Sequence, residues 1–373
     1  MSLYTKNKLE KTSGNTNTIY PMMTDGMNAI ITQVRQGEEL SPRAIENMAD
    51  MLLDESICDE KKADFLRGLT AKGETPAEIA GFVEAFLKRA VDPEVGQLEL
   101  DGPTIDVCGT GGDKLNLFNV STTSMFVIAA GGGVVVKHGN RGITSKSGGA
   151  DVLEALGIKL DATPAQFREC LKEAGVGFLF APMYHPAFKA IARVRAALAK
   201  EGVRTIFNLI GPLLNPVRPE CQLVGICQPG LRASYSEILS RLGRDSAWVV
   251  HGHTLDGRSV DEVSLMGTTH ISKSGAYQDL EDEEISPEDF GMPVASVEDL
   301  AGGEAEENAK ILEDILSGKD QGPKRNMVVL NAAAGLACAG LADHMEDAIE
   351  KAGALIDSGE ALKRLRLMQS VFQ

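Results

Sequence analysis

Apolar side chains recur at helical spacing through the first hundred residues, and proline-containing caps mark where the helices begin. Ser41-Pro42 is typical of an N-cap with proline at the first helical position, and the residues after it place their apolar side chains on one face. Thr75-Pro76-Ala77-Glu78 forms a capping box ahead of a second apolar face, which ends near residue 92. The pattern predicts a small domain of helices only, over residues 24–100.

From residue 104 the pattern changes to short apolar runs that alternate with helical stretches. Thr163-Pro164 opens one such helix, and another is expected over residues 186–199. Alternation of this kind is typical of an α/β domain with a central, mostly parallel sheet, which we place at residues 101–373. The expected strands are residues 104–108, 134–137, 177–180, 223–227, 247–251 and 327–330.

The first twenty residues are polar and lack an apolar core of the kind a secretory signal has, so we expect a flexible N-terminal arm over residues 1–23. The longest apolar stretch, residues 125–136, is interrupted by three glycines and is too short to span a membrane. The six cysteines are scattered and form no CxxC pair. Free thiols in a reducing cytoplasm are the simplest interpretation.

Charge narrows the classes of partner. The chain has 37 Lys and Arg against 53 Asp and Glu, a net charge of −16, and only 5% of its residues are aromatic. An acidic body with few aromatic side chains is a poor nonspecific partner for nucleic acid or an anionic membrane. The acidic stretch at residues 278–290 is interpreted as a solvated surface loop.

The first candidate site is the glycine-rich segment 109–113, Gly-Thr-Gly-Gly-Asp, which directly follows the strand ending at Cys108. A strand, a glycine turn and a helix together expose backbone N–H groups that can hold phosphate. The spacing matches neither the dinucleotide-binding nor the Walker pattern. A tight structural turn would also use glycines, so this segment alone leaves both interpretations open.

Two further segments offer polar groups after strands. Residues 119–122, Asn-Val-Ser-Thr, precede an apolar helix and could serve as its N-cap through Ser121 or Thr122, as an anion site, or as both. Residues 137–151 combine Lys137, Arg141 and Lys146 with four glycines. An acidic chain that concentrates cations and glycines in one loop is expected to bind a polyanion there.

The adjacent carboxylates Asp261 and Glu262 lie about ten residues beyond the strand at 247–251. Side chains of neighbouring residues in an extended segment point to opposite sides, yet on a loop they can together hold a hard cation such as Mg²⁺. Acidic pairs are common on surfaces, so this signal is weak alone. It gains weight from the two loops that suit a polyanion.

Taken in order, these motifs resemble those of the anthranilate phosphoribosyltransferase family. The series is GTGGD, NVST, KHGNR, SKSG-GADVLEALG, HPAFK, RTIFN-IGPLLNP and DEVSL, and it extends from about residue 25 to the C-terminus. The resemblance implies transfer of 5-phosphoribose from phosphoribosyl pyrophosphate to the amine of anthranilate, a step of tryptophan biosynthesis. It also implies Mg²⁺, a homodimer joined through the small domains, and a helical segment near 185–200 added to the small domain.

The resemblance assigns residues to each substrate. The donor site would consist of Gly109, Gly112, Asp113, Asn119, Ser121, Thr122, Lys137, Asn140, Ser145 and Lys146. The acceptor site would consist of Gly109, His138, Asn140, Phe188, Arg195 and Pro212. Mg²⁺ would be held by Ser121, Asp261 and Glu262. Arg195 suits the acceptor because a planar guanidinium matches a carboxylate in two-point contact, although a surface salt bridge is the alternative. No general base is assigned.

Four departures from the family pattern bear on these roles. Leu117 replaces a usual threonine and Gly149 a usual serine, and the segments 199–202 and 253–260 are longer than usual. A different aromatic amine therefore stays open as the acceptor. A pyrimidine nucleoside phosphorylase would not need the Asp261-Glu262 pair, and a noncatalytic nucleic-acid-binding relative conflicts with the net charge.

Overall fold

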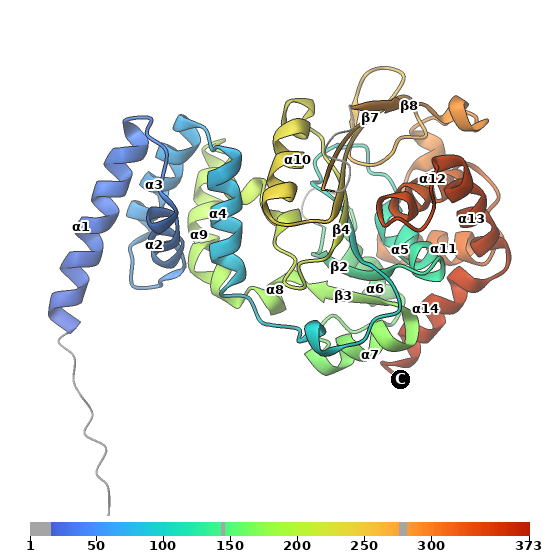
Figure 1. The fold of residues 1–373 in the computed structure, drawn as a ribbon, viewed down its shortest axis with the longest axis horizontal. Coiled ribbons are helices and arrows are strands. Elements are labelled where there is room, and N and C mark those ends of the chain that lie inside the picture. The colour runs from blue at the N-terminus through green and yellow to red at the C-terminus, as the bar shows by residue number, and fades with distance from the viewer. Residues whose placement is uncertain (1–15, 143–145, 276–281) are drawn as a thin grey trace, which may run out of the picture.

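The structure, a computed structural model, describes residues 16–142, 146–275 and 282–373. A helical domain stands beside a larger α/β domain (Figure 1). The helical domain contains α1 (Thr16–Arg35), α2 (Pro42–Leu53), α3 (Asp59–Lys72) and α4 (Pro76–Leu87), and α9 (Lys189–Lys200) from the middle of the chain packs against α2 and α3. The fold class expected from the sequence is therefore confirmed.

The caps read from the sequence form as expected. The Ser41 hydroxyl accepts the Ala44 N–H at the start of α2, and Thr75 forms a complete capping box with Glu78 at the start of α4. Thr163 does the same for α7 (Pro164–Ala174). Side-chain oxygens thus satisfy N–H groups that have no partner within the helix.

The N-terminal arm is shorter than expected. Helix α1 begins at Thr16, so residues 16–23, which we assigned to a flexible arm, are helical. Adding residues to an existing helix costs far less than nucleating one, so a polar segment can extend a helix whose later turns are packed. Those later turns bury Met27, Ile31 and Val34 in the helical-domain core. Residues 1–15 lie outside the described part of the chain.

The α/β domain is built on one sheet whose described strands follow the order β3-β2-β1-β4-β5-β7-β8, with β6 paired to β5. Strands β1 to β5 run parallel, and β6, β7 and β8 are antiparallel additions at the β5 side. The bounds are β1 (Thr104–Gly109), β2 (Val134–Gly139), β3 (Val176–Phe180), β4 (Cys221–Gly225), β5 (Ser246–His253), β6 (Ser259–Val260), β7 (Thr269–Gly275) and β8 (Glu283–Ile285).

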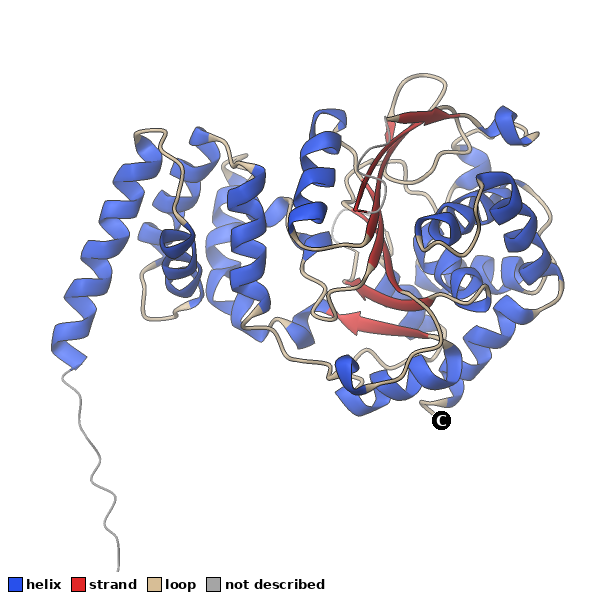
Figure 2. Cartoon of the chain, in the orientation of Figure 1, coloured by secondary structure: helices blue, strands red, loops and turns tan. Residues whose placement is uncertain are grey.

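Helices cover both faces of this sheet (Figure 2). One face packs against α5 (Val120–Ala130) and α6 (Gly149–Ala155), and against the C-terminal helices α11 (Ala305–Leu316), α12 (Pro323–Cys338), α13 (Met345–Asp357) and α14 (Glu360–Ser370). The other face carries α10 (Arg232–Arg241) toward the helical domain, and α7 with the short α8 (Ala181–Tyr184) near β3. Alternate strand residues supply the two cores, as with Val249 and Val250.

The strand expected at residues 327–330 is wrong. These residues belong to α12, whose residues 327–338 are all buried. A helix that is buried on every side shows no polar face, so a short apolar run within it cannot be distinguished from a buried strand. Close packing explains the sequence of α12, since a Cβ on Gly335 would come within 2.4 Å of Ile128 on α5.

The acidic stretch 278–290 is not a loop throughout. Its residues 283–285 form β8 at the edge of the sheet, and Lys273 on β7 pairs with Glu283 at 2.7 Å. The polar composition of β7 and β8 hid both strands from the sequence analysis. Residues 276–281, which include the start of the stretch, lie outside the described residues.

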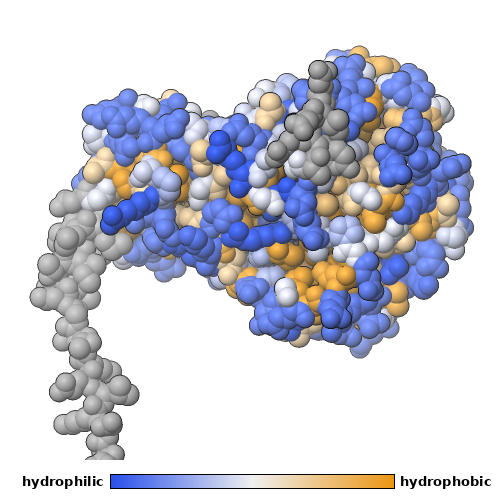
Figure 3. Space-filling view, viewed as in Figure 1, coloured by the Kyte–Doolittle hydropathy of each residue, from blue (hydrophilic) through white to orange (hydrophobic). Residues whose placement is uncertain are grey.

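The surface fits an acidic, well-packed chain. Figure 3 shows a face that is hydrophilic over most of its area, with hydrophobic residues gathered in smaller patches on both domains. Among the described residues, no helix combines the length and the apolar character needed to cross a membrane.

A buried ion pair holds the helical domain together. Lys72 and Glu78 meet at 2.6 Å with side chains 5% and 2% exposed, and Glu78 also accepts the Leu40 N–H. Burial acts to raise the pKa of Glu78, but Lys72 and the N–H groups of Thr75 and Leu40 outweigh it, so the pKa is lowered.

Replacing Lys72 by methionine should therefore destabilise the protein. The change leaves Glu78 charged and buried without its partner, which costs about 3–5 kcal/mol of unfolding free energy near neutral pH. The loss should shrink as the pH falls through the lowered pKa of Glu78 in the parent, because the parent loses the same contribution there. Urea unfolding at two pH values measures both effects, and an equal loss at both would contradict the assignment.

Candidate active site

The glycine-rich segment 109–113 lies where β1 ends, at the carboxyl edge of the parallel strands. Gly111 and Gly112 have φ values of 71° and 96°, a region that favours glycine. The Gly111 N–H donates to Asp261 Oδ2 at 2.6 Å, and a Cβ on Gly109 would approach the same oxygen within 2.4 Å. The glycines therefore let the loop and Asp261 pack against each other.

Asp261, Glu262 and Asp113 bring negative charge together at this edge. Burial, followed by the charge of Asp113, raises the pKa of Asp261 to about 7. Burial and the charge of Asp261 raise the pKa of Glu262 to about 8. Asn331 on α12 fixes the chain beside the pair, because its amide bonds both the N–H and the carbonyl of Val263. Confined like charges of this kind are stabilised when a cation joins them.

Lys137 is buried on β2 and does not lie in an open loop. Its side chain is turned toward β1 and α5, where Nζ donates to the Val107 carbonyl and, at 3.1 Å, to Ser121 Oγ. Glu262 lines a small buried cavity together with Ser121. The charge of Lys137 acts to lower the pKa of the Glu262 carboxyl, but burial and Asp261 outweigh it. Lys137, Ser121 and Glu262 thus form one cluster next to the glycine loop.

The expected N-cap at Ser121 or Thr122 is wrong. Helix α5 begins at Val120, with Asn119 as its N-cap residue, and no side chain caps it. Asn119 instead links two distant segments: its Nδ2 donates to the Ser147 carbonyl, and its Oδ1 accepts from Asn308 on α11. The sequence carried no signal for Asn308, because its contact exists only in the folded chain.

One cation of the loop after β2, Arg141, forms ion pairs with carboxylates of the helix that follows the loop. Arg141 pairs with Asp151 at 2.9 Å and with Glu154 at 2.7 Å, and both carboxylates lie on α6. The Arg141 guanidinium therefore has carboxylate partners close to its own loop, and polyanion binding by the loop stays a prediction. Asn140 and Lys146 are exposed, while Ser145 lies outside the described residues.

Strand alternation places the donor and acceptor candidates of β2 on opposite faces of the sheet. Lys137 faces α5, whereas the ring of His138 lies 5.3 Å from that of His185, the residue after α8. Burial, followed by the nearby His185, lowers the pKa of His138 to about 3, so its ring is neutral. His185 Nε2 bonds the Leu214 carbonyl at 2.7 Å, and its ring contacts Phe188.

Arg195 shares an aromatic neighbour with Phe188. Its guanidinium carbon lies 5.1 Å from the centre of the Phe207 ring, which also contacts Phe188 at 5.7 Å. Arg195 is half-buried, and burial lowers its pKa. No described carboxylate forms an ion pair with it, so the alternative of a surface salt bridge is wrong for the described residues. Phe207 is therefore a further candidate residue, which the assignment from the sequence did not include.

Pro212 belongs to the same face, in the turn that follows Phe207. Its carbonyl accepts from Gln222 on β4 at 2.7 Å. Asn215, three residues on, donates to Asp106 and to the Val136 carbonyl, so this turn is tied to β1 and β2. The turn therefore has a fixed position relative to His138.

The departures from the family pattern have local explanations. A Cβ on Gly149 would lie 2.8 Å from Thr122 Oγ1, so a serine there would require Thr122 to move. Leu117 is half-buried and packs against the α/β core. In the longer segment 199–202, Glu201 pairs with Arg67 on α3 at 2.8 Å. That segment therefore links the end of α9 to α3 within the helical domain.

Comparisons with known proteins agree with this architecture. A family model described as the glycosyl transferase family a/b domain matches residues 101–362, and one described as its helical bundle domain matches residues 28–90. Anthranilate phosphoribosyltransferase from Desulfosudis oleivorans is 42% identical over 336 residues, which are 90% of this chain and 95% of that protein.

Solved structures of the same kind superpose on the chain. Anthranilate phosphoribosyltransferase from Thermus thermophilus has a TM-score of 0.82 and 36% identity, covering 92% of this chain and 99% of that one. The Saccharomyces cerevisiae protein, in complex with phosphoribosyl pyrophosphate and Mg, has a TM-score of 0.80 and 26% identity, covering 94% and 98%. With identity above 40% over nine tenths of its length, the chain belongs to the anthranilate phosphoribosyltransferase family.

Proposed function

We propose that the protein transfers the 5-phosphoribosyl group from phosphoribosyl pyrophosphate to the amine of anthranilate, a reaction of tryptophan biosynthesis. The amine nitrogen forms a bond to C1 of the ribose while the bond from C1 to the pyrophosphate oxygen breaks. Pyrophosphate leaves with the electron pair, and the amine gives up a proton. The observation that carries this proposal is that the glycine loop, Lys137 and two adjacent buried carboxylates meet at one edge of the sheet.

The donor would lie along the glycine loop, α5 and β2. The loop of Gly109, Gly112 and Asp113 has little side-chain bulk, so a phosphate group of the donor can approach its backbone closely. Lys137 and Ser121 add a buried cation beside a hydroxyl. Preorganised donors of this type stabilise charge that develops on a leaving group without reorganising at the moment of reaction. The remaining candidates for this site are Asn119, Thr122, Asn140, Ser145 and Lys146.

Mg²⁺ fits the residues at this edge. Asp261 and Glu262 are hard oxygen ligands, and Ser121 adds a hydroxyl. Burial, followed by neighbouring negative charge, raises the pKa of both carboxyls, and a bound cation would offset both effects. Among the described residues, no three His, Cys, Asp or Glu side chains form a metal-binding group, so water and phosphate oxygens would complete the shell. When bound, Mg²⁺ supplies Lewis-acid stabilisation of the departing pyrophosphate.

The acceptor would lie on the other face of β2, against His138, Phe188, Arg195 and Pro212. Arg195 presents a half-buried guanidinium over an aromatic ring, with no carboxylate partner among the described residues, and this suits a planar aromatic carboxylate. Neutral His138 adds no charge that would compete for it. The residues need not supply a strong base, because an anilinic amine is already a neutral nucleophile and positioning supplies much of the rate.

A homodimer joined through the helical domains stays a prediction.

Lys137 provides a direct test of the donor assignment. Lys137→Met should raise the donor KM or lower kcat, with a loss in kcat/KM of about ten- to a hundredfold, because a charge-assisted hydrogen bond is worth about 1.5–3 kcal/mol. The acceptor KM should stay within about twofold. Initial rates with each substrate varied in turn measure both, and Lys146→Met gives the comparison for the exposed cation. An effect confined to the acceptor would assign the cluster to the other substrate.

Acceptor choice tests the function itself. Purified protein with phosphoribosyl pyrophosphate and Mg²⁺ should consume anthranilate, seen as loss of its fluorescence, and should use aniline poorly. Equal use of aniline would show that the carboxylate is not recognised. Preference for a third aromatic amine would keep the reaction class and replace the acceptor.

A further inference from the structure

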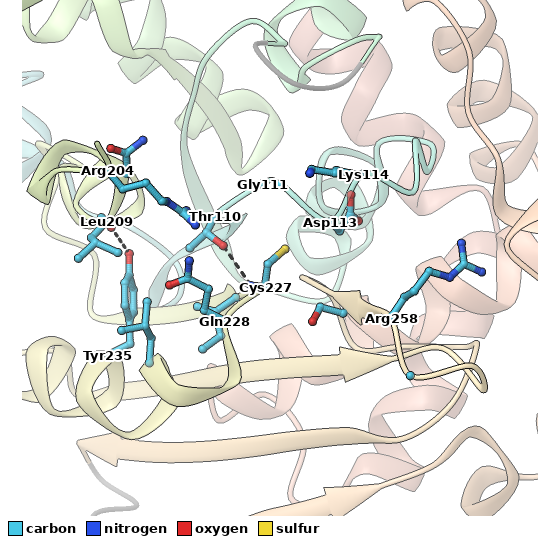
Figure 4. A pocket seen from close by; sticks show the side chains of 16 residues that line it. Thr110, Gly111, Asp113, Lys114, Arg204, Leu209, Cys227, Gln228, Tyr235 and Arg258 are labelled. Atoms are coloured by element: carbon cyan, nitrogen blue, oxygen red, sulfur yellow. Dashed lines mark hydrogen bonds between the residues drawn. The ribbon is translucent and has the colours of Figure 1, made fainter. Parts of the chain in front are cut away.

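A cavity of about 450 Å³ lies beside the glycine loop, and neither Lys137 nor any of the assigned acceptor residues lines it. It is formed by the glycine loop, the ends of β4 and α10, the β5–β6 hairpin and the segment after α9, as Figure 4 shows. We call it the cationic pocket, because Lys114, Arg204 and Arg258 line it against one carboxylate, Asp113. In a chain with a net charge of −16, a pocket with three cationic side chains and one carboxylate in its lining departs from the overall charge balance.

The backbone of Arg204 is bonded to the helical domain, while its side chain lines the cationic pocket. Its carbonyl accepts from the Thr70 hydroxyl on α3 at 3.0 Å. Its side chain extends toward Thr110 of the glycine loop (Figure 4). Among the described residues no carboxylate pairs with the guanidinium, whereas Arg258 across the pocket is paired with Asp256 at 3.0 Å. Arg204 therefore carries an unused charge across the space between the two domains.

Lys114 supplies a second unused charge from the opposite wall. It follows Asp113 directly and holds a φ of 61°, a left-handed conformation that few non-glycine residues adopt. It is exposed, and no described residue forms an ion pair with it. Figure 4 shows its amine turned toward the glycine loop. Leu209, Leu231 and Tyr235 form part of the pocket wall, and apolar walls strengthen the attraction between a cation and an anion.

We propose that Arg204 and Lys114 form a subsite for a phosphoryl group of the donor, with Arg204 supplied by the helical domain. The inference rests on the proposed function, and it names binding residues that lie outside the set assigned above. A doubly phosphorylated donor has two ends that share this chemistry, its pyrophosphate and its 5-phosphate. A cation contributed by the helical domain also makes donor binding depend on the relative position of the two domains.

Calorimetry on the full-length protein with Mg²⁺ tests the subsite, using pyrophosphate and ribose 5-phosphate as separate probes. Arg204→Gln should weaken one of them ten- to a hundredfold, Arg204→Lys should restore part of the loss, and Lys114→Gln should weaken the same probe. Loss for pyrophosphate assigns the subsite to the leaving group, and loss for ribose 5-phosphate assigns it to the other end. Arg241→Gln is the matched control, since Arg241 is exposed on α10 and paired with Glu237.

The result that overturns the subsite is binding of both probes within twofold of the parent in Arg204→Gln, with unchanged thermal unfolding as proof that the variant is folded. Failure of the proposed function gives a different result. If the parent binds a probe through Arg204 but transfers nothing to anthranilate, the subsite stands and the function falls. If the parent transfers phosphoribose and Arg204→Gln has the parent's donor KM, the function stands and the subsite falls.

Discussion

The double variant Asp261→Asn with Glu262→Gln is expected to lower kcat/KM by about a thousandfold or more, the scale of losing electrostatic stabilisation of a leaving group. The amides keep the shape of the side chains, which matters because Gly109 and Gly225 pack directly on Asp261. They remove the charge that would hold Mg²⁺ beside the pyrophosphate. Glu283→Gln with Glu284→Gln is the matched control, an adjacent acidic pair on the edge strand β8 that should leave kcat/KM unchanged.

The same variant has a readout that does not depend on turnover. Because the folded-state pKa values of Asp261 and Glu262 are raised, to about 7 and about 8, their protonated forms favour the folded state at low pH. That contribution is present below about pH 4, near the ordinary carboxyl values, and is lost as the pH rises through the raised pKa values. Mg²⁺ should offset the loss, so it should raise the Tm of the parent more at pH 8 than at pH 6.

The double variant should show neither the pH-dependent loss nor the Mg²⁺ effect. Thermal unfolding with and without Mg²⁺ at the two pH values measures both. A normal Mg²⁺ dependence of turnover in the variant would contradict the metal assignment, even if stability changed.

Arg195→Ala carries the second large effect, on the acceptor. An anthranilate carboxylate that enters the site loses its water, and without Arg195 it finds no cation among the described neighbours of the Phe207 ring. Leaving a buried anion unpaired costs about 2–4 kcal/mol, so kcat/KM for anthranilate should fall by about thirty- to a thousandfold. Aniline lacks the carboxylate and should discriminate little between parent and variant.

Two controls separate this effect from a structural one. Arg193→Ala changes an arginine two residues away on α9, 87% exposed and 3.4 Å from Asp59, and should leave anthranilate use nearly unchanged. Donor binding by calorimetry with Mg²⁺ should hardly change in Arg195→Ala. Loss of donor binding before any loss of acceptor use would place Arg195 elsewhere, and the adjacent segment 199–202 would then be the first place to search for a changed pocket.

Much of the fold could be predicted from local signals in the sequence. Ser41, Thr75 and Thr163 each precede a proline, and that arrangement determines where α2, α4 and α7 begin, because the cap and the first turn involve neighbouring residues. The five parallel strands followed from their apolar runs. The same signal failed for residues 327–330, where burial on all sides removed the periodicity that separates a helix from a strand.

The site was harder to read, because its geometry depends on contacts between distant segments. Sequence spacing brought Asp261 into the argument but could not show that its carboxylate bonds the Gly111 N–H, 150 residues earlier. Nor could the spacing show that Arg141 forms ion pairs with Asp151 and Glu154. Asn308 gave no signal at all, since it acts only through a partner from another element. Phe207 lies within the RTIFN motif but received no role, because its contacts with Arg195 and Phe188 form only in the folded chain.

The most direct test of the account measures the loss of one substrate and the release of one product of the same reaction. Anthranilate consumption, followed by fluorescence, and pyrophosphate release, followed by a coupled pyrophosphatase assay on withdrawn samples, should rise together in a one-to-one ratio when donor and Mg²⁺ are present. Both should stop when Mg²⁺ is chelated. Pyrophosphate release that does not depend on anthranilate, or anthranilate loss without pyrophosphate, would contradict transfer of phosphoribose to this amine.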